Sequence, residues 1–171
     1  MCAAILSDTL LFRSPTCTPL DESTARKLAQ IAEVDLESFA MEMFEAGSSL
    51  RGKTPEELFS QDYKVFQVNN LSIGVSQISS VNQRELDKVA KMMQEYVPVH
   101  LSAMGIQLSY IMLTNIHEQS SKLLAFGTDA LQHAKEAFGV EAQGNVCVLP
   151  GVVSRKKQVV PALVSVLQES M

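Results

Sequence analysis

The sequence predicts an α/β protein, with a mixed β-sheet flanked by helices and preceded by a helical N-terminal extension. Three observations predict this class. Apolar residues recur at helical spacing between residues 18 and 47, and the pattern becomes extended from Lys64. Beyond residue 82, helical and extended stretches alternate, as in α/β domains. One pair of adjacent extended stretches indicates a hairpin, so the sheet is expected to be mixed.

The N-terminal part carries the start signals of three helices. Thr18-Pro19 followed by Asp21 is typical of a capped helix start with proline in the first turn. Asp35 precedes a second amphipathic stretch that ends near Gly47, and Thr54-Pro55 repeats the capped pattern for a short third helix. We therefore expect residues 1–45 to form a separate, mainly helical piece and residues 46–171 to form the α/β domain.

The remaining elements are predicted from turn-forming residues and from the spacing of apolar residues. Asn69-Asn70 lies between two extended runs and predicts the turn of the hairpin. Pro98 should kink or split the helix that contains it. The elements expected after the hairpin are a helix over 83–104, a buried strand over 108–114, a helix from Thr128 to Gly139, a strand over 145–149 and a final helix over 159–167.

Length and composition narrow the class of protein. A chain of 171 residues suits one compact domain with an extension, and 46% hydrophobic and 19% charged residues describe an ordinary globular protein. The net charge of −5 argues against a nucleic-acid partner. No apolar stretch approaches the roughly 20 residues needed to cross a bilayer, so a cytoplasmic protein without a membrane partner is expected. Cys2, Cys17 and Cys147 form no close pair and are expected to be reduced thiols.

The most unusual local feature is the cationic run from Ser154 to Gln158, which reads SRKKQ in an otherwise acidic chain. It follows a predicted strand and opens a predicted helix. A helix start offers backbone N–H groups and the positive end of the helix dipole, and Arg155 and Lys156 add a planar fork and a point charge. This combination suits a phosphate. A solvated basic turn is the alternative interpretation.

Two further residues are candidates with ordinary alternatives. Asp8 directly follows the apolar run CAAILS, where a carboxylate is costly unless it is paired or bound to a metal, although helix capping explains it equally well. Lys64 precedes a strand, where it is a binding residue or a solvated edge residue that discourages aggregation. The three histidines show no spacing that would place them on one metal-binding face.

Two segments stand out as possible family signatures, Ser7–Thr16 (SDTLLFRSPT) and Gly151–Pro161 (GVVSRKKQVVP). Both resemble signatures of family II, manganese-dependent inorganic pyrophosphatases of the DHH phosphoesterase superfamily. Segments between them, at residues 41–47, 62–66 and 126–127, are similar in order and spacing. The resemblance runs nearly end to end and corresponds to the C-terminal part of such an enzyme, with the last segment of the DHH domain in front.

The resemblance implies a division of labour. In that family an N-terminal DHH domain carries a two-metal site for Mn²⁺ or Mg²⁺, and the C-terminal domain closes over it to clamp inorganic diphosphate. Asp8 matches the last metal-binding aspartate of the DHH domain. Lys64, Arg155 and Lys156 match the cationic residues that hold the phosphates, and positive groups there would neutralise charge on a transferring phosphoryl group.

The family's early His-x-x-x-Asp-x-Asp segment, its bridging aspartate and its Asp-His-His motif appear nowhere in the sequence. One aspartate cannot replace a two-metal centre, so the chain is expected to be inactive alone and to hold no metal stably. It should need a DHH domain in cis or in trans, and apolar surface on its N-terminal piece could instead seek a second copy. The alternatives are a non-catalytic phosphate-binding or oligomerisation module and part of an exopolyphosphatase-like phosphoesterase.

Local departures from the family pattern at Ser79 and Thr114-Asn115-Ile116 affect none of the principal clamp residues.

Overall fold

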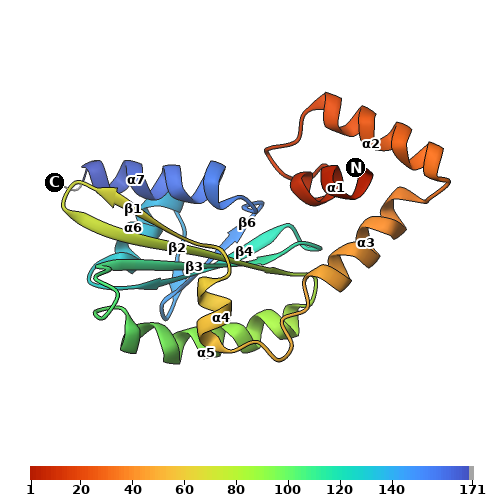
Figure 1. Ribbon diagram of the computed structural model, residues 1–171. Helices are drawn as coiled ribbons and strands as arrows, with labels where there is room; N and C mark the ends of the chain where they lie inside the picture. The colour runs from red at the N-terminus through yellow and green to blue at the C-terminus, as the bar shows by residue number, and fades with distance from the viewer. Residues whose placement is uncertain (170–171) are drawn as a thin grey trace. The chain divides into compact units, whose positions relative to one another are not determined.

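The computed structural model describes residues 1–169 and divides the chain into two compact units, Met1–Ser49 and a second that begins at Leu50. The first unit consists of three helices (Figure 1), which are α1 (Cys2–Thr9), α2 (Pro19–Ala32) and α3 (Leu36–Gly47). All strands and the other helices belong to the second unit. The helical character expected of the N-terminal part is confirmed.

The predicted helix starts are confirmed by their caps. The Thr18 hydroxyl accepts the Asp21 N–H, and the Asp21 carboxylate accepts the Thr18 N–H at 2.9 Å, which forms a capping box. Asp35 accepts the Ser38 N–H at 2.9 Å at the start of α3. A second capping box, between Thr54 and Glu57, begins α4 (Pro55–Ser60). Local sequence signals therefore determine these starts.

The second unit is built on a six-stranded mixed sheet with strand order β1-β2-β3-β4-β6-β5. Only β2 and β3 are parallel, and every other neighbouring pair is antiparallel. Asn69, at a left-handed φ of 53°, forms the predicted turn between the first two strands. The strands are β1 (Tyr63–Val68), β2 (Leu71–Ser80), β3 (Leu108–Asn115), β4 (Ser120–Phe126), β5 (Ala142–Gln143) and β6 (Val146–Pro150).

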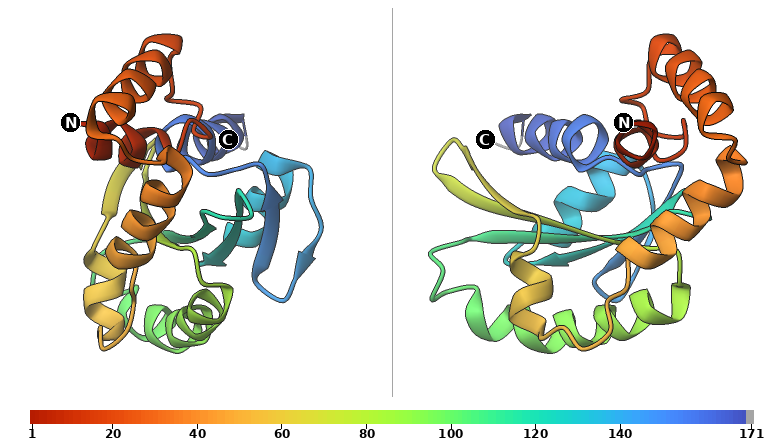
Figure 2. Two further views of the ribbon diagram at one scale, coloured as in Figure 1. Left: turned by 90° about the vertical axis from the view of Figure 1, so that its right-hand side faces the viewer. Right: turned by 45° about the vertical axis from the view of Figure 1, so that its right-hand side comes forward.

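Helices cover both faces of this sheet, as Figures 1 and 2 show. One face packs against α4 and α5 (Gln83–His100), around Phe59, Leu86 and Met93. The other face packs against α6 (Ala130–Phe138), the π-helical turn η1 (Arg155–Val159) and α7 (Val160–Glu169). Because both faces are covered, β3 is buried along its whole length, as its continuous apolar run predicts.

Several boundaries differ from the predicted ones, and two strands were not predicted. The helix that contains Pro98 runs through it and ends at His100 rather than at residue 104, and α6 begins at Ala130 rather than at Thr128. Strand β4 has a polar start followed by a continuous apolar stretch, so it shows neither helical nor alternating spacing. Strand β5 has only two residues, too few for any period. The final helical segment starts earlier than predicted, at Arg155, because it opens with a π-helical turn.

A close approach between Gly74 and Tyr63 gives a first prediction. A Cβ added to Gly74 would lie 1.8 Å from the Tyr63 hydroxyl oxygen, which is buried without a hydrogen-bond partner. Burial also raises the pKa of Tyr63. We expect Gly74→Ala to destabilise the protein by about 1–3 kcal/mol through overpacking. Tyr63→Phe should be neutral or slightly stabilising, because it removes an unpaired buried hydroxyl. Urea denaturation of both variants checks this, and an unchanged midpoint for Gly74→Ala would contradict it.

Candidate functional site

The cationic run follows strand β6 and begins the final helical segment. The chain leaves β6 at Pro150, turns at Gly151 with a φ of 73°, and enters η1 at Arg155. Ser154 is the N-cap, and its hydroxyl accepts the Lys157 N–H at 3.2 Å. The predicted placement of these residues, after a strand and at a helix start, is confirmed.

The side chain of Gln158 fixes the shape of this turn. Its Oε1 accepts the main-chain N–H groups of Val153 at 3.0 Å and Ser154 at 2.9 Å, and its Nε2 donates to the carbonyl oxygen of Gly151 at 3.0 Å. One amide therefore satisfies three backbone groups that the tight turn leaves without partners. The last residue of the SRKKQ run thus has a clear structural role.

A second amide, that of Gln77 in β2, ties the same turn to the sheet. Gln77 Oε1 accepts the Arg155 N–H at 3.3 Å, while its Nε2 donates to Thr114 Oγ1 at 3.1 Å and to the Val153 carbonyl oxygen at 3.0 Å. Thr114 is fully buried and is also within 3.0 Å of the Ser121 hydroxyl. Sequence reasoning missed Gln77, because a lone glutamine in a strand has no local signal for a partner 78 residues away.

These contacts change the expected origin of anion affinity. The N–H groups of Arg155 and Lys157 at the helix start are already bonded, to Gln77 and Ser154. They are therefore not free for a ligand, contrary to the expectation from the sequence. The positive groups that remain at this turn are the cationic side chains and the positive end of the helix dipole.

The guanidinium of Arg155 lies mostly within the protein, with 13% of its side chain exposed. Nη2 forms an ion pair with Asp62 Oδ1 at 2.9 Å. Nη1 donates to the main-chain carbonyl of Asp62 and, at 3.5 Å, to that of Val75. Both terminal nitrogens of the guanidinium therefore already contact protein acceptors, while Lys156 and Lys157 beside it are exposed.

Lys64 lies on the same face of the sheet as the cationic turn. In β1, Phe66 and Val68 pack into the core beneath α6 and α7, and alternation places Lys64 on that face too. Its cross-strand partner is Val75, whose carbonyl oxygen accepts from Arg155. The fold thus brings together Lys64 and Arg155, which are 91 positions apart in the sequence.

Asp8 belongs to the first unit and is exposed near the C-terminal end of α1. It does not cap the start of this helix, whose N-cap is Met1. Together with Thr9, Thr16 and Asp21 it lines a pocket within that unit. A metal centre needs several such ligands, and residues 1–169 contain no group of three or more histidine, cysteine or acidic side chains that could hold an ion. Asp8 could therefore supply only one ligand of a metal site.

The turn after Asp8 is conformationally unusual. Leu10, Leu11 and Phe12 have left-handed φ angles of 48°, 52° and 65°. Each such residue with a Cβ is disfavoured, so surrounding contacts must hold the turn. They include hydrogen bonds from Leu11 N–H to the Leu6 carbonyl at 2.9 Å and from Ser14 N–H to the Thr9 carbonyl at 2.8 Å. The first signature segment therefore encodes a specific, strained backbone shape.

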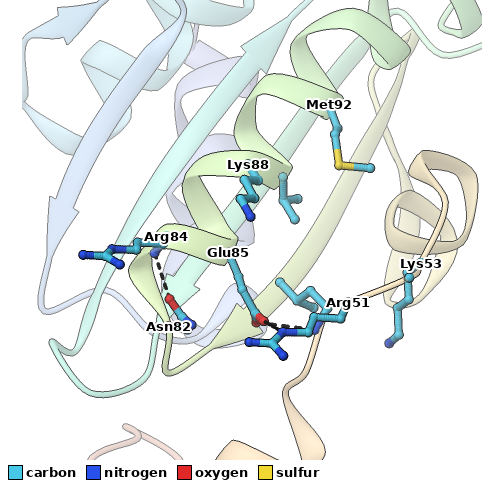
Figure 3. A pocket seen from close by; sticks show the side chains of 10 residues that line it. Arg51, Lys53, Asn82, Arg84, Glu85, Lys88 and Met92 are labelled. Atoms are coloured by element: carbon cyan, nitrogen blue, oxygen red, sulfur yellow. Dashed lines mark hydrogen bonds and ion pairs between the residues drawn. The ribbon is translucent and has the colours of Figure 1, made fainter.

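A separate pocket of about 530 Å³ lies beside the start of α5, and Figure 3 shows its residues. Two of the four cationic residues that line it contact partners in the protein. Arg51 contacts Glu85 at 3.4 Å, and Lys53 donates to the Gln61 side chain at 2.7 Å. Glu85 also accepts from the Leu50 N–H at 3.5 Å, so its contacts tie residues 50–51 to α5. These contacts give the pocket a structural explanation and distinguish it from the Arg155 region on the other face of the sheet.

Comparison with known protein families identifies the class. Residues 41–166 match the model of the DHHA2 domain, so the chain belongs to the DHHA2 family. In the part of the chain that the structure describes, no helix is both long and apolar enough to span a membrane.

Individual relatives show that the chain is similar to the C-terminal part of family II inorganic pyrophosphatases. The chain is 43% identical over 168 residues to a protein of Clostridium acetobutylicum assigned as a manganese-dependent inorganic pyrophosphatase, covering 98% of this chain and 54% of the relative. It is 42% identical over 167 residues to the cobalt-dependent inorganic pyrophosphatase of Clostridium perfringens, covering 98% of this chain and 30% of that protein.

The fold leads to the same family. The chain superimposes with a TM-score of 0.85, at 36% identity, on the crystal structure of a Methanococcus jannaschii protein assigned to family II of the inorganic pyrophosphatases. The match covers 97% of this chain and 54% of that structure. The chain thus spans about half the length of several relatives that it matches. The family resemblance and the fold class expected from the sequence are confirmed.

Proposed function

We propose that this chain is the substrate-clamping part of a metal-dependent inorganic pyrophosphatase, which converts diphosphate and water into two phosphates. The observation that carries the proposal is the convergence of Lys64 and Arg155 on one face of the sheet, with Lys156 exposed next to Arg155. Cationic groups held in place by a folded scaffold stabilise the charge on a transferring phosphoryl group, since they need no reorganisation during the reaction.

The three cationic clamp residues differ in how they would contact diphosphate. Lys64 and Lys156 are exposed point charges that can reach separate phosphoryl oxygens, whereas Arg155 supplies a planar fork on a nearly rigid side chain. Gln77 and Gln158 hold the turn that carries two of the three cations. This arrangement binds and orients diphosphate, but it contains no group that activates water.

Activation of the attacking water requires a metal site that the clamp residues do not provide. A two-metal centre of Mn²⁺ or Mg²⁺ would activate water and contact both oxygens of the displacement. Asp8 would supply one ligand there, and a DHH domain in cis or in trans would supply the others. We therefore expect the 171-residue chain to be inactive by itself and to retain no metal stably.

Complementation with the missing half tests this proposal. Mixing the chain, in the presence of Mn²⁺, with a separately expressed DHH fragment of a relative that ends before the aspartate matching Asp8 is expected to restore phosphate release from diphosphate. A chelator should abolish the activity, because the reaction depends on the metal site. An Asp8→Asn chain is a matched control and should complement poorly, since it lacks one ligand. A folded, metal-loaded complex that releases no phosphate would contradict the proposal.

Two alternatives predict different results in the same assay. An exopolyphosphatase-like enzyme would release phosphate faster from tripolyphosphate than from diphosphate. A non-catalytic phosphate-binding or oligomerisation module would form a complex, or a dimer with its own copy, without hydrolysis. The net charge of −5 and the composition favour a cytoplasmic protein without a nucleic-acid or membrane partner.

A further inference from the structure

Asp62 is the residue whose contacts with Arg155 the proposed clamp does not use. It lies immediately before β1, two positions from Lys64, and its side chain is 47% exposed. Its carboxylate pairs with Arg155 Nη2 at 2.9 Å, and its main-chain carbonyl accepts from Nη1. A negative charge therefore lies among the three cations that are to bind an anion.

A carboxylate and a phosphate compete for the same edge of a guanidinium. One carboxylate oxygen of Asp62 contacts Arg155 Nη2, and a phosphate that binds the fork through two oxygens would need that nitrogen as well. The Asp62 carboxylate takes part of that fork, and the Val75 carbonyl at 3.5 Å restrains Nη1 further. Diphosphate would also be repelled by a carboxylate left beside it.

The exposure of the two partners indicates which side chain moves. Arg155 is 13% exposed and is held at its backbone by Gln77, whereas the Asp62 carboxylate is about half-exposed at the end of a strand. Rotation of Asp62 into water requires no change in the turn or the sheet. Because water reaches the half-exposed Asp62 carboxylate and screens its attraction to Arg155, the pair can exchange with a ligand that carries more charge.

We infer that Asp62 is an affinity-determining residue: it occupies the Arg155 fork in the free protein, and an incoming polyphosphate anion must displace it. This inference rests on the proposed function, since it concerns the same site. Asp62 thereby screens the clamp against weakly bound anions and returns to Arg155 when the ligand leaves. The clamp is then electrically balanced at this arginine when empty.

Removing the charge of Asp62 tests the inference. Asp62→Asn keeps the size of the side chain and is expected to tighten diphosphate binding on the order of fivefold, the value of a partly exposed ion pair. Asp87→Asn is the matched control, because Asp87 pairs with Lys122 at 2.8 Å and lies on α5, on the other face of the sheet. It changes the net charge equally and should leave the affinity unchanged.

A double-mutant cycle shows whether the effect acts through Arg155. Calorimetric titration with diphosphate is performed on Asp62→Asn, Arg155→Ala and the double variant. The gain from Asp62→Asn should be smaller when Arg155 is absent, because only the direct repulsion between the carboxylate and diphosphate then remains. Weaker binding by Asp62→Asn would overturn the inference, because it would mean that Asp62 orients Arg155 for the ligand. Equal affinities of Asp62→Asn and the unmodified chain would overturn it as well.

A second measurement needs no ligand and separates this inference from the proposed function. The guanidinium resonances of Arg155 in NMR should show slow rotation about the Nε–Cζ bond in the unmodified chain and faster rotation in Asp62→Asn. Fast rotation in the unmodified chain would contradict the contact itself. If diphosphate does not bind either protein but the rotation changes as expected, the clamp proposal fails and the Asp62 contact stands.

Discussion

Replacing Arg155 and Lys156 together by alanine is expected to weaken diphosphate binding by about a hundredfold or more. Each side chain offers charge-assisted hydrogen bonds, worth about 1.5–3 kcal/mol apiece, and their loss combines because both contact one small ligand. The fold should persist, because Lys156 is exposed and the turn is held by Gln77 and Gln158. Stability should fall, because Arg155 loses its contacts with Asp62 and Val75. Calorimetry at low salt is the measurement, because surface charge effects are screened at high ionic strength.

The matched control for this variant is Arg84→Ala/Lys88→Ala. These two cations are exposed on α5, on the opposite face of the sheet, and their removal lowers the net charge by the same amount. Affinity should remain within about twofold, as expected for a small change in the overall field of the protein. An equal loss in both double variants would show that diphosphate binds by non-specific attraction, which would refute the clamp.

Gln77→Ala is expected to have the second largest effect, on affinity and on stability. The truncation leaves the Arg155 N–H, the Val153 carbonyl and the buried Thr114 hydroxyl without this partner. We expect a stability loss of about 1–3 kcal/mol from the unsatisfied groups. Binding should weaken about tenfold, because the turn that positions two cations loses its tie to the sheet. Urea denaturation and calorimetry on the same sample separate the two effects.

Gln67→Ala is the control for Gln77→Ala. Gln67 is exposed in the neighbouring strand β1, and its amide donates to the Ser72 hydroxyl at 2.7 Å. Its removal should leave both stability and affinity nearly unchanged. If Gln77→Ala binds diphosphate as tightly as Gln67→Ala does, the turn is rigid without Gln77 and its assignment as a positioning residue is wrong.

Local sequence signals predicted much of the fold. Thr18 and Thr54 begin their helices with capping boxes that can be read from four residues, and Asn69 forms the turn that joins two alternating strands. Strand β4 was missed because burial on both faces removes the alternation that reveals a strand. The predicted end of α5 was wrong by four residues, since helix ends depend weakly on sequence.

The candidate site was only partly predictable. The SRKKQ run can be recognised as a cationic cluster in the sequence. Lys64 was added by the family resemblance, because a single lysine at the edge of a strand gives no sign of a binding role. Gln77 and Asp62 were not predicted as parts of the site, because their roles arise from contacts 78 and 93 positions away along the chain. Tertiary register, rather than local pattern, creates both contacts. The sequence therefore identifies the cationic residues. The fold identifies Gln77, which positions them, and Asp62, which pairs with one of them.

The most direct test of the substrate-clamping role is a calorimetric titration of the unmodified 171-residue chain with diphosphate, in Mg²⁺ and at low salt. We predict saturable binding at one site per chain, displaced by an excess of orthophosphate and weakened by added salt. A chain that is folded by circular dichroism and yet gives no binding heat at several temperatures would contradict a preformed diphosphate clamp in this chain.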